Sequence, residues 1–311
     1  MPPRFHILAY ALPVILALAA LEAAVLYFVR KRQYNWKASL ASLADLLTRD
    51  YVIQPLIRIS IAFPVLYWAV VHNIGAVPDN PWLDFLIVFF GQEFGYYWFH
   101  RCSHRIRWMW ATHSIHHSPN ELNLSAAYRT GITGKISGVE LFFVPLLWLG
   151  FSPQAVFGTL ALNLLYQFWL HTDWIPKLGP LEYVLNTPSH HRVHHAANVD
   201  YLDANYGGVL IIFDRLFGTL TPEREDLPCR FGLVKPLTSN NPLVVEFHEW
   251  ASLARDLWRA RSLREYLGYL FAPPGWRPDG EGLTTAALRR AAAAPEARPD
   301  AEDWPAAVAA E

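Results

Sequence analysis

The chain has little of several features that define familiar protein classes. Only 17% of its 311 residues are charged, against roughly 25% in an ordinary soluble domain. Two cysteines, Cys102 and Cys229, are too few for a disulfide framework. The 26 basic and 27 acidic residues nearly balance, which excludes a nucleic-acid binder driven by bulk positive charge. The strings H-E-x-x-H and G-x-S-x-G are absent, which argues against a membrane zinc protease and an acyl hydrolase.

The chain is rich in apolar residues. Hydrophobic residues make up 53% of it and aromatic residues 14%. This composition is too rich in aromatic side chains for a disordered chain. A surplus of apolar residues over charged ones is typical of a membrane protein.

The apolar residues gather in stretches of membrane-spanning length. Phe5–Val29 has one acid and covers about 37 Å as a helix, enough to cross a bilayer. A signal peptide is the alternative interpretation of this first stretch. The other predicted spans are Tyr51–His72, Trp82–Phe99, and a hairpin of Ile136–Leu149 and Pro153–Leu170 that turns at Gly150–Pro153. The hairpin either spans the membrane or re-enters it.

Basic residues give these spans a direction. Arg30, Lys31 and Arg32 follow the first span, and Arg101 and Arg105 follow the third. Because positive residues stay on the cytosolic side, we expect an outside N-terminus and a cytosolic end of the third span. The hairpin returns the chain to the side it left. The sequence therefore predicts an integral, multi-pass protein of a bacterial inner membrane or an endoplasmic reticulum.

The rest of the chain is more polar. Residues 171–236 carry turn signals and predict a cytosolic cap. Residues 246–271 predict an amphipathic helix at the membrane interface. From residue 273 on we expect a disordered tail with one short helix near 283–294. The predicted fold is all-α, with about three spans, a helical hairpin and a helical cap. Its expected parts are transmembrane helices in 1–99, a histidine-rich core in 100–235 with the hairpin at 136–170, an interfacial region in 236–272 and a tail in 273–311.

Histidine is concentrated in the centre of the chain. Ten of the 13 histidines lie between His100 and His195. Residues three and four apart share a helix face, so the rings of each cluster should point the same way. In particular, we expect His191, His194 and His195 to lie on one side of a site. The three clusters and one single residue are His100/His104, His113/His116/His117, His191/His194/His195 and His171.

Nine clustered imidazoles point to metal binding. Neutral imidazole is the commonest metal ligand in proteins, and nine rings exceed the four ligands of one zinc. They fit two metals with four or five nitrogens each, and imidazole suits iron as well as zinc or copper. His190 stays open as a further ligand, whereas His6, His72 and His248 are expected to be ordinary residues. Acids that could bind the metal or orient the rings are Glu93, Glu121, Asp173 and Asp203.

The order and spacing of these clusters resemble the fatty acid hydroxylase/sterol desaturase superfamily. Its pattern of H-x(3,4)-H followed by two H-x-x-H-H motifs matches the three clusters within residues 84–220. The strings around the clusters resemble the alkylglycerol monooxygenase branch of this superfamily. They include Tyr96–Arg101, Trp110–His113, Asn186–His195, Asn205–Gly208 and Asp214–Thr219.

The resemblance implies a helical membrane enzyme that holds two irons at a cytosolic site and oxidises lipid C–H bonds with O₂. In the ether-lipid branch it implies cleavage of alkylglycerols with tetrahydrobiopterin as reductant; a redox-protein partner is the other expected electron donor. Arg101, Arg105, Arg129 and Arg192 are candidates for contacts with the lipid headgroup. The alternatives are a sterol or fatty-acyl desaturase or hydroxylase, a metal-dependent membrane hydrolase, and a metal transporter. No nucleic-acid partner is expected.

Overall fold

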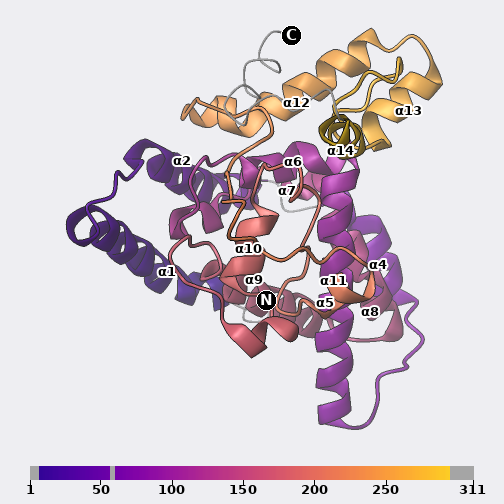
Figure 1. Ribbon diagram of the computed structural model, residues 1–311. Helices are drawn as coiled ribbons and strands as arrows, with labels where there is room; N and C mark the ends of the chain where they lie inside the picture. Colours follow the sequence, from indigo (N-terminus) through magenta and orange to yellow (C-terminus); the bar gives the residue numbers. More distant parts are fainter. Residues whose placement is uncertain (1–6, 57–59, 295–311) are drawn as a thin grey trace.

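A computed structural model describes residues 7–56 and 60–294, and its regular elements are all helical (Figure 1). The only β-type contacts within these ranges are two isolated bridges, Leu185 with Leu210 and Ala196 with Phe231. The prediction of an all-α chain is therefore confirmed for the described residues. His6, the start of the first predicted span and residues 295–311 lie outside them.

The N-terminal region holds the longest apolar stretch. Among the described residues, Ala11–Val29 is the one helix whose length and composition suffice to cross a membrane. After it the chain turns at Lys31, and the next helix begins where the Asn35 side chain accepts from the Ala38 amide. The helices of this region are α1 Ile7–Ala24, η1 Val25–Val29, α2 Trp36–Leu47, η2 Thr48–Ile53 and α3 Gln54–Leu56.

A buried acid fastens α1 to the rest of the protein. The Glu22 carboxylate accepts from the Leu124 amide at 2.7 Å, the Thr172 hydroxyl at 3.1 Å and the Trp174 indole at 2.9 Å. An ionisable group in an apolar helix needs such partners. Because Thr172 follows His171, this contact ties the apolar helix to the histidine-rich core.

The next two predicted spans differ from each other. The stretch 51–72 is not one helix: α3 ends at Leu56, a turn follows at 61–62, and α4 Phe63–Val71 begins with Pro64 in its first turn. The third span lies in one long helix, α5 Pro81–Arg105, capped by the side chain of Asn80. This helix extends past the predicted end at residue 99 and carries the first histidine cluster.

The predicted hairpin is a series of short helices followed by one long one. Gly150, with φ of 110°, makes the turn between them, a conformation that favours glycine. Buried apolar residues of α4, α5, α8 and α9 pack into one core, and at Gly95 a side chain would meet the Phe142 carbonyl at 2.9 Å. The elements from the end of α5 are α6 Arg107–His117, η3 Leu124–Tyr128, α7 Gly134–Ser137, η4 Val139–Phe143, α8 Val144–Leu149 and α9 Pro153–Phe168.

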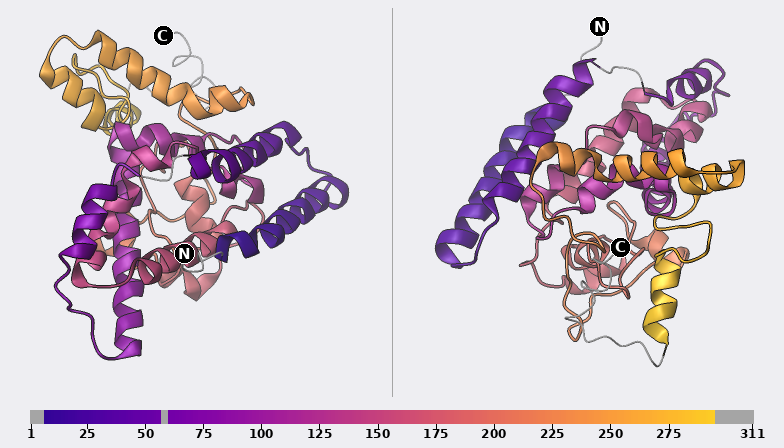
Figure 2. Two further views of the ribbon diagram at one scale, coloured as in Figure 1. Left: turned by 180° about the vertical axis from the view of Figure 1, so that it is seen from behind. Right: turned by 90° about the horizontal axis from the view of Figure 1, so that it is seen from above.

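The C-terminal helices lie along one side of the molecule, next to α6 and α2 (Figure 2). The amphipathic region appears as two helices, α12 and α13, separated at residues 260–262, and α12 packs against α6. Residues 273–294, where we expected a disordered chain with a short helix, form turns and α14, whose Leu288 is buried. The elements are η5 Gly179–Tyr183, α10 Pro188–His194, α11 Ile212–Leu216, α12 Pro242–Arg259, α13 Leu263–Phe271 and α14 Thr285–Ala293.

Candidate metal centre

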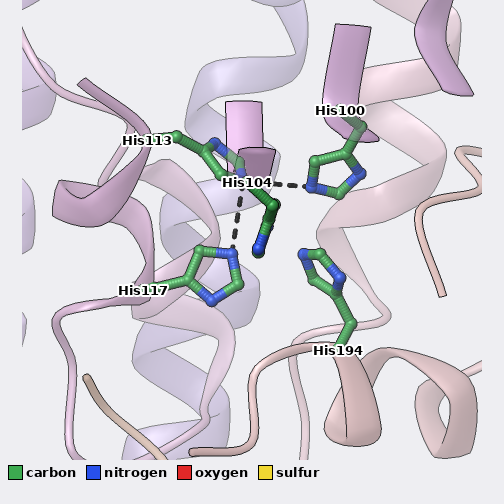
Figure 3. Close-up of side chains that lie close together, drawn as sticks. All are labelled: His100, His104, His113, His117 and His194. Carbon is green, nitrogen blue, oxygen red and sulfur yellow. Dashed lines mark hydrogen bonds between the residues drawn. The ribbon is translucent and has the colours of Figure 1, made fainter. Parts of the chain in front are cut away.

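Helices α5, α6 and α10 bring eight histidines together in the protein interior, and the loop after α9 adds a ninth, His171. Each ring offers a nitrogen, and within each of two groups these nitrogens all lie within 4.8 Å of one another. Figure 3 shows the rings of the larger group pointing toward one another. The five-histidine group is His100, His104, His113, His117 and His194. The four-histidine group is His116, His171, His191 and His195.

The H-x-x-H-H motif on α6 supplies both groups. Successive helical residues are about 100° apart, so residue i+4 returns to within about 40° of residue i, whereas i+3 falls about 60° to the other side. His113 and His117 therefore enter the five-histidine group together. His116, on the other side of His113, enters the four-histidine group.

The second H-x-x-H-H motif, on α10, has the opposite assignment. His191 and His195, four residues apart, enter the four-histidine group, and His194 crosses to the five-histidine group. Our expectation that these three rings lie on one side of the site was wrong, because the helical offset of about 100° separates His194 from His195. Each motif contributes two rings to one group and one ring to the other.

Backbone carbonyls fix the orientation of several rings. A carbonyl oxygen only accepts, so the Nδ1 atom that contacts it must carry the proton, and Nε2 is left with a lone pair. This second contact is what orients histidines that bind metals. The bonds run from His100 to Tyr206, from His194 to Ala204, from His116 to Arg129 and from His171 to Gln167, at 2.9, 2.9, 3.0 and 2.9 Å.

The freed nitrogens face one another without a proton between them. His116 and His171 both donate from Nδ1, and their Nε2 atoms lie 3.2 Å apart. Two lone pairs at this distance repel unless a cation lies near both. In the other group, the Nε2 atoms of His104 and His194 have no hydrogen-bond partner among the described residues. Unpaired buried acceptors that converge in this way fit a metal ion in each group.

The surroundings keep the rings neutral, as metal ligands must be. Burial lowers the pKa of His116 to about 4 and that of His171 to about 3. Burial, together with the neighbouring imidazoles, also lowers the pKa of the remaining group members on α6 and α10 well below the usual value. These are His113, His117, His191, His194 and His195.

One of the four predicted acids lies beside the metal-binding rings. The Asp203 carboxylate lies 3.7 Å from Nδ1 of His104 and 3.2 Å from the guanidinium of Arg105. Burial opposes its ionisation, but the contact with His104 and the charge of Arg105 hold the pKa of Asp203 below its usual value. Asp203 can therefore hold the orientation of His104.

Comparison with known proteins agrees with this geometry. The family model described as fatty acid hydroxylase matches residues 85–219, which contain all nine histidines. Over these residues the chain is similar to the fatty acid hydroxylase family. No solved structure matches the chain.

Three curated relatives of this chain have named activities. Alkylglycerol monooxygenase of Homo sapiens is 44% identical over 201 residues, 64% of this chain and 44% of the relative. That of Danio rerio is 41% identical over 215 residues, 69% of this chain and 47% of the relative. Ornithine lipid hydroxylase OlsE of Rhizobium tropici is 33% identical over 128 residues, 41% of this chain and 38% of the relative. The chain thus spans less than half the length of these relatives.

The other predicted acids lie away from the rings of the two histidine groups. Glu93 accepts from the amides of Val209 and Leu210, both at 2.9 Å, and so anchors the loop after α10 to α5. Asp173 forms a salt bridge of 2.5 Å with Arg32. Glu121 is exposed. His190 is buried but belongs to neither group of the described residues, and its Nδ1 lies 3.4 Å from the Thr187 hydroxyl.

The predicted headgroup arginines use their donors within the protein. Arg129, 2% exposed, donates to the Ser42 and Ser118 hydroxyls and to the Ala38 carbonyl. Arg192 makes two bonds to the Glu223 carboxylate, at 2.7 and 2.6 Å. These two arginines hold the fold together around the rings.

The two remaining arginines have partners as well. Arg101 donates to the Tyr97 hydroxyl at 2.9 Å, with its guanidinium 5.4 Å from the Trp98 ring centre. Arg105 pairs with Asp203, as described above. The structure therefore gives each of the four arginines an internal partner.

Our interpretation of the sequence missed the groups that orient the rings. Asp214 accepts from the amides of Tyr206 and Gly207, both at 2.8 Å, and so shapes the loop whose Tyr206 carbonyl accepts from His100. A side chain at Gly207 would meet the Leu210 carbonyl at 2.3 Å, so only glycine fits. The strings Asn205–Gly208 and Asp214–Thr219 were the available signal, but carbonyl acceptors leave no trace in a sequence.

A cavity of about 710 Å³ adjoins the rings of the two histidine groups. His113, His116 and His171 reach its wall, so both histidine groups border it. Much of the wall is apolar, as the binding site of a lipid chain should be. Apolar residues of α1, α4 and α9 that line it include Leu12, Ile15, Phe63, Leu66, Phe157, Leu160, Leu164 and Leu165.

Proposed function

We propose that this protein is a membrane-bound monooxygenase that binds one iron in each histidine group and hydroxylates a lipid C–H bond with O₂ and an external reductant. The observation that carries the proposal is the pair of histidine groups, with opposed unprotonated nitrogens, at the wall of a largely apolar cavity. Two reduced irons, when bound, would supply the electrons and the oxidising power that cleave O₂ and attack an unactivated C–H bond.

The chain's own residues position the metals and the lipid. The carbonyls of Tyr206, Ala204, Arg129 and Gln167 keep four rings in the tautomer that presents Nε2. The apolar wall would hold an alkyl chain beside His113, His116 and His171, within reach of metals bound to both groups.

The substrate class proposed first is an ether lipid of the alkylglycerol type. Its support is the identity of 41–44% to relatives named alkylglycerol monooxygenase. Hydroxylation of the carbon beside the ether oxygen gives a hemiacetal, which breaks into an aldehyde and a glycerol. Hydroxylation or desaturation of another lipid is the alternative, and the relative named ornithine lipid hydroxylase supports it.

We further propose an integral, multi-pass protein whose metal site faces the cytosol. Support comes from the apolar helix Ala11–Val29, with Arg30, Lys31 and Arg32 directly after it, and from the position of His100 beyond the third predicted span. Labelling of single cysteines introduced at residues 150–153 and 198–203 tests this topology. External labelling at 198–203 would contradict it.

The proposed activity is tested with protein purified in detergent and loaded with Fe(II). It is mixed with 1-O-hexadecylglycerol, heavy-isotope O₂ and either tetrahydrobiopterin or a reduced ferredoxin. We expect hexadecanal formation that requires O₂ and is lost in His116→Ala, while His190→Ala keeps it. Mass spectrometry of the intact hydroxylated products of other lipids covers the alternative substrates. Iron-loaded protein that oxidises no lipid with either donor, or zinc-loaded protein that hydrolyses one, would overturn the proposal.

A further inference from the structure

The cavity beside the histidine groups contains four charged side chains that the mechanism above does not use. They form two ion pairs of opposite charges. The Arg49 Nε lies 3.0 Å from Asp50, and the Lys135 ammonium lies 3.6 Å from Glu140. Ser60 and Gln54 also line the cavity and donate to Glu140 at 2.9 Å and to Asp50 at 3.3 Å. The charges among the described lining residues therefore cancel.

The first pair is tied to the four-histidine group. Arg49 donates to the Tyr128 carbonyl at 3.2 Å and to the Thr130 hydroxyl, on either side of Arg129. The Arg129 carbonyl is the acceptor that fixes His116. Arg49 thus contacts the segment 128–130, and this segment in turn contacts the His116 ring.

The second pair lies close to the five-histidine group. Lys135 follows Thr133 by two residues, and the Thr133 hydroxyl lies 2.8 Å from that of Thr112. Thr112 directly precedes His113 and shares the cavity wall with it. Lys135 thus lies on α7, which contacts the metal-binding helix α6, and Arg49 reaches α6 indirectly through residues 128–130. The polar part of the cavity therefore lies near the rings.

We propose that the Arg49–Asp50 and Lys135–Glu140 pairs bind the substrate's headgroup and select lipids whose headgroup carries hydroxyl groups and no net charge. Hydroxyl groups donate and accept, so they can join the carboxylates of Asp50 and Glu140 and the cations of Arg49 and Lys135 without separating either pair. A phosphate has no unpaired cation to meet here, and it would compete with the existing carboxylates. This inference rests on the proposed lipid-binding role of the cavity.

Binding measured without turnover tests this selection. The probes are 1-O-hexadecylglycerol and its 3-phosphate, each displacing a fluorescent alkylglycerol from the full-length protein in detergent. We expect the wild type to prefer the neutral lipid by at least about tenfold, the ratio that 1.4 kcal/mol represents. Equal binding of both lipids by the wild type would overturn the proposal.

Matched variants locate the effect. Glu140→Gln keeps the acceptor for Ser60 but leaves Lys135 unpaired, so the phosphate should gain about tenfold relative to the neutral lipid. Lys135→Gln should weaken phosphate binding further. Asp226→Asn changes the net charge as Glu140→Gln does, but its partner Arg224 lies on the surface, so the preference should stay at the wild-type ratio.

The outcomes separate this inference from the proposed activity. A wild-type ratio in Glu140→Gln, or the same gain in Asp226→Asn, would refute the selection by the ion pairs. A shifted preference in a protein that oxidises no lipid would leave the selection standing and refute only the monooxygenase activity. Normal oxidation with no preference between the two lipids would refute the selection and leave the monooxygenase activity standing.

Discussion

Removing one imidazole from each histidine group should have unequal effects on metal content. His116→Ala reduces the four-histidine group to three rings, whereas His194→Ala leaves four in the five-histidine group. Loss of an orienting contact alone costs about 10- to 100-fold in metal affinity, and loss of a ligand should cost more. We therefore expect His116→Ala to retain one metal per chain and His194→Ala to retain two, with one of them held weakly.

The assay is metal content per chain after dialysis against a graded series of chelator concentrations. His190→Ala is the matched control, because His190 is a buried ring of α10 that belongs to neither group. It should keep the metal content of the wild type. Equal losses in His116→Ala and His194→Ala, or a loss as large in His190→Ala, would refute the division into a group of five and a group of four.

Three further predictions concern the rings and the groups that support them. Asp203→Asn should weaken the metal of the five-histidine group about 10- to 100-fold, because His104 loses its carboxylate neighbour; metal titration should show no change in the other group. Glu22→Ala leaves three donors without an acceptor and should destabilise the protein by about 3 kcal/mol, seen as a lower melting temperature in detergent; an unchanged melting temperature would contradict the anchoring role. Metal-free protein should lose stability as pH falls: burial lowers the folded-state pKa of His116 to about 4 and of His171 to about 3, so the unfolded chain takes up protons first, below about 6.5. The stability contributed by the two neutral imidazoles is fully present above a pH of about 6.5 and is lost as the pH falls toward 4 and 3. A melting temperature of the metal-free protein that is the same between pH 8 and pH 5 would contradict this prediction.

The sequence was most informative where spacing alone decides the outcome. Eight histidines predicted from their three- and four-residue spacing lie together with the single residue His171, because a helix brings residues at such spacing close to one another. Whether each ring turns to one group or the other depends on the relative rotation of α6 and α10. That rotation is a property of packing, so the exchange of His116 and His194 between the groups could not be predicted from spacing.

Proximity in the sequence was a poor guide for the acids. Asp173 is two residues from His171 but pairs with Arg32, 141 residues away. Asp203 is distant in sequence from His104 and yet lies beside it. Tertiary contacts decide which of several nearby acids faces a ring, and no local pattern encodes them.

The membrane segments show the same limit. The stretch 51–72 has enough apolar residues for a span, yet the described part is broken before α4, with Pro64 in the first turn of that helix. Apolar composition located the helical stretches, and turn residues decided where the helices end. The start of the long α5 was predicted best, because its apolar run from Trp82 begins one residue after Pro81, the first residue of the helix.

Elemental analysis of the wild-type protein tests the central claim most directly. The protein is purified in detergent from cells grown with iron and zinc, and the metals are counted per chain. The account predicts two irons per chain, one for each histidine group. A single zinc with no iron would contradict it and would direct the search toward hydrolysis.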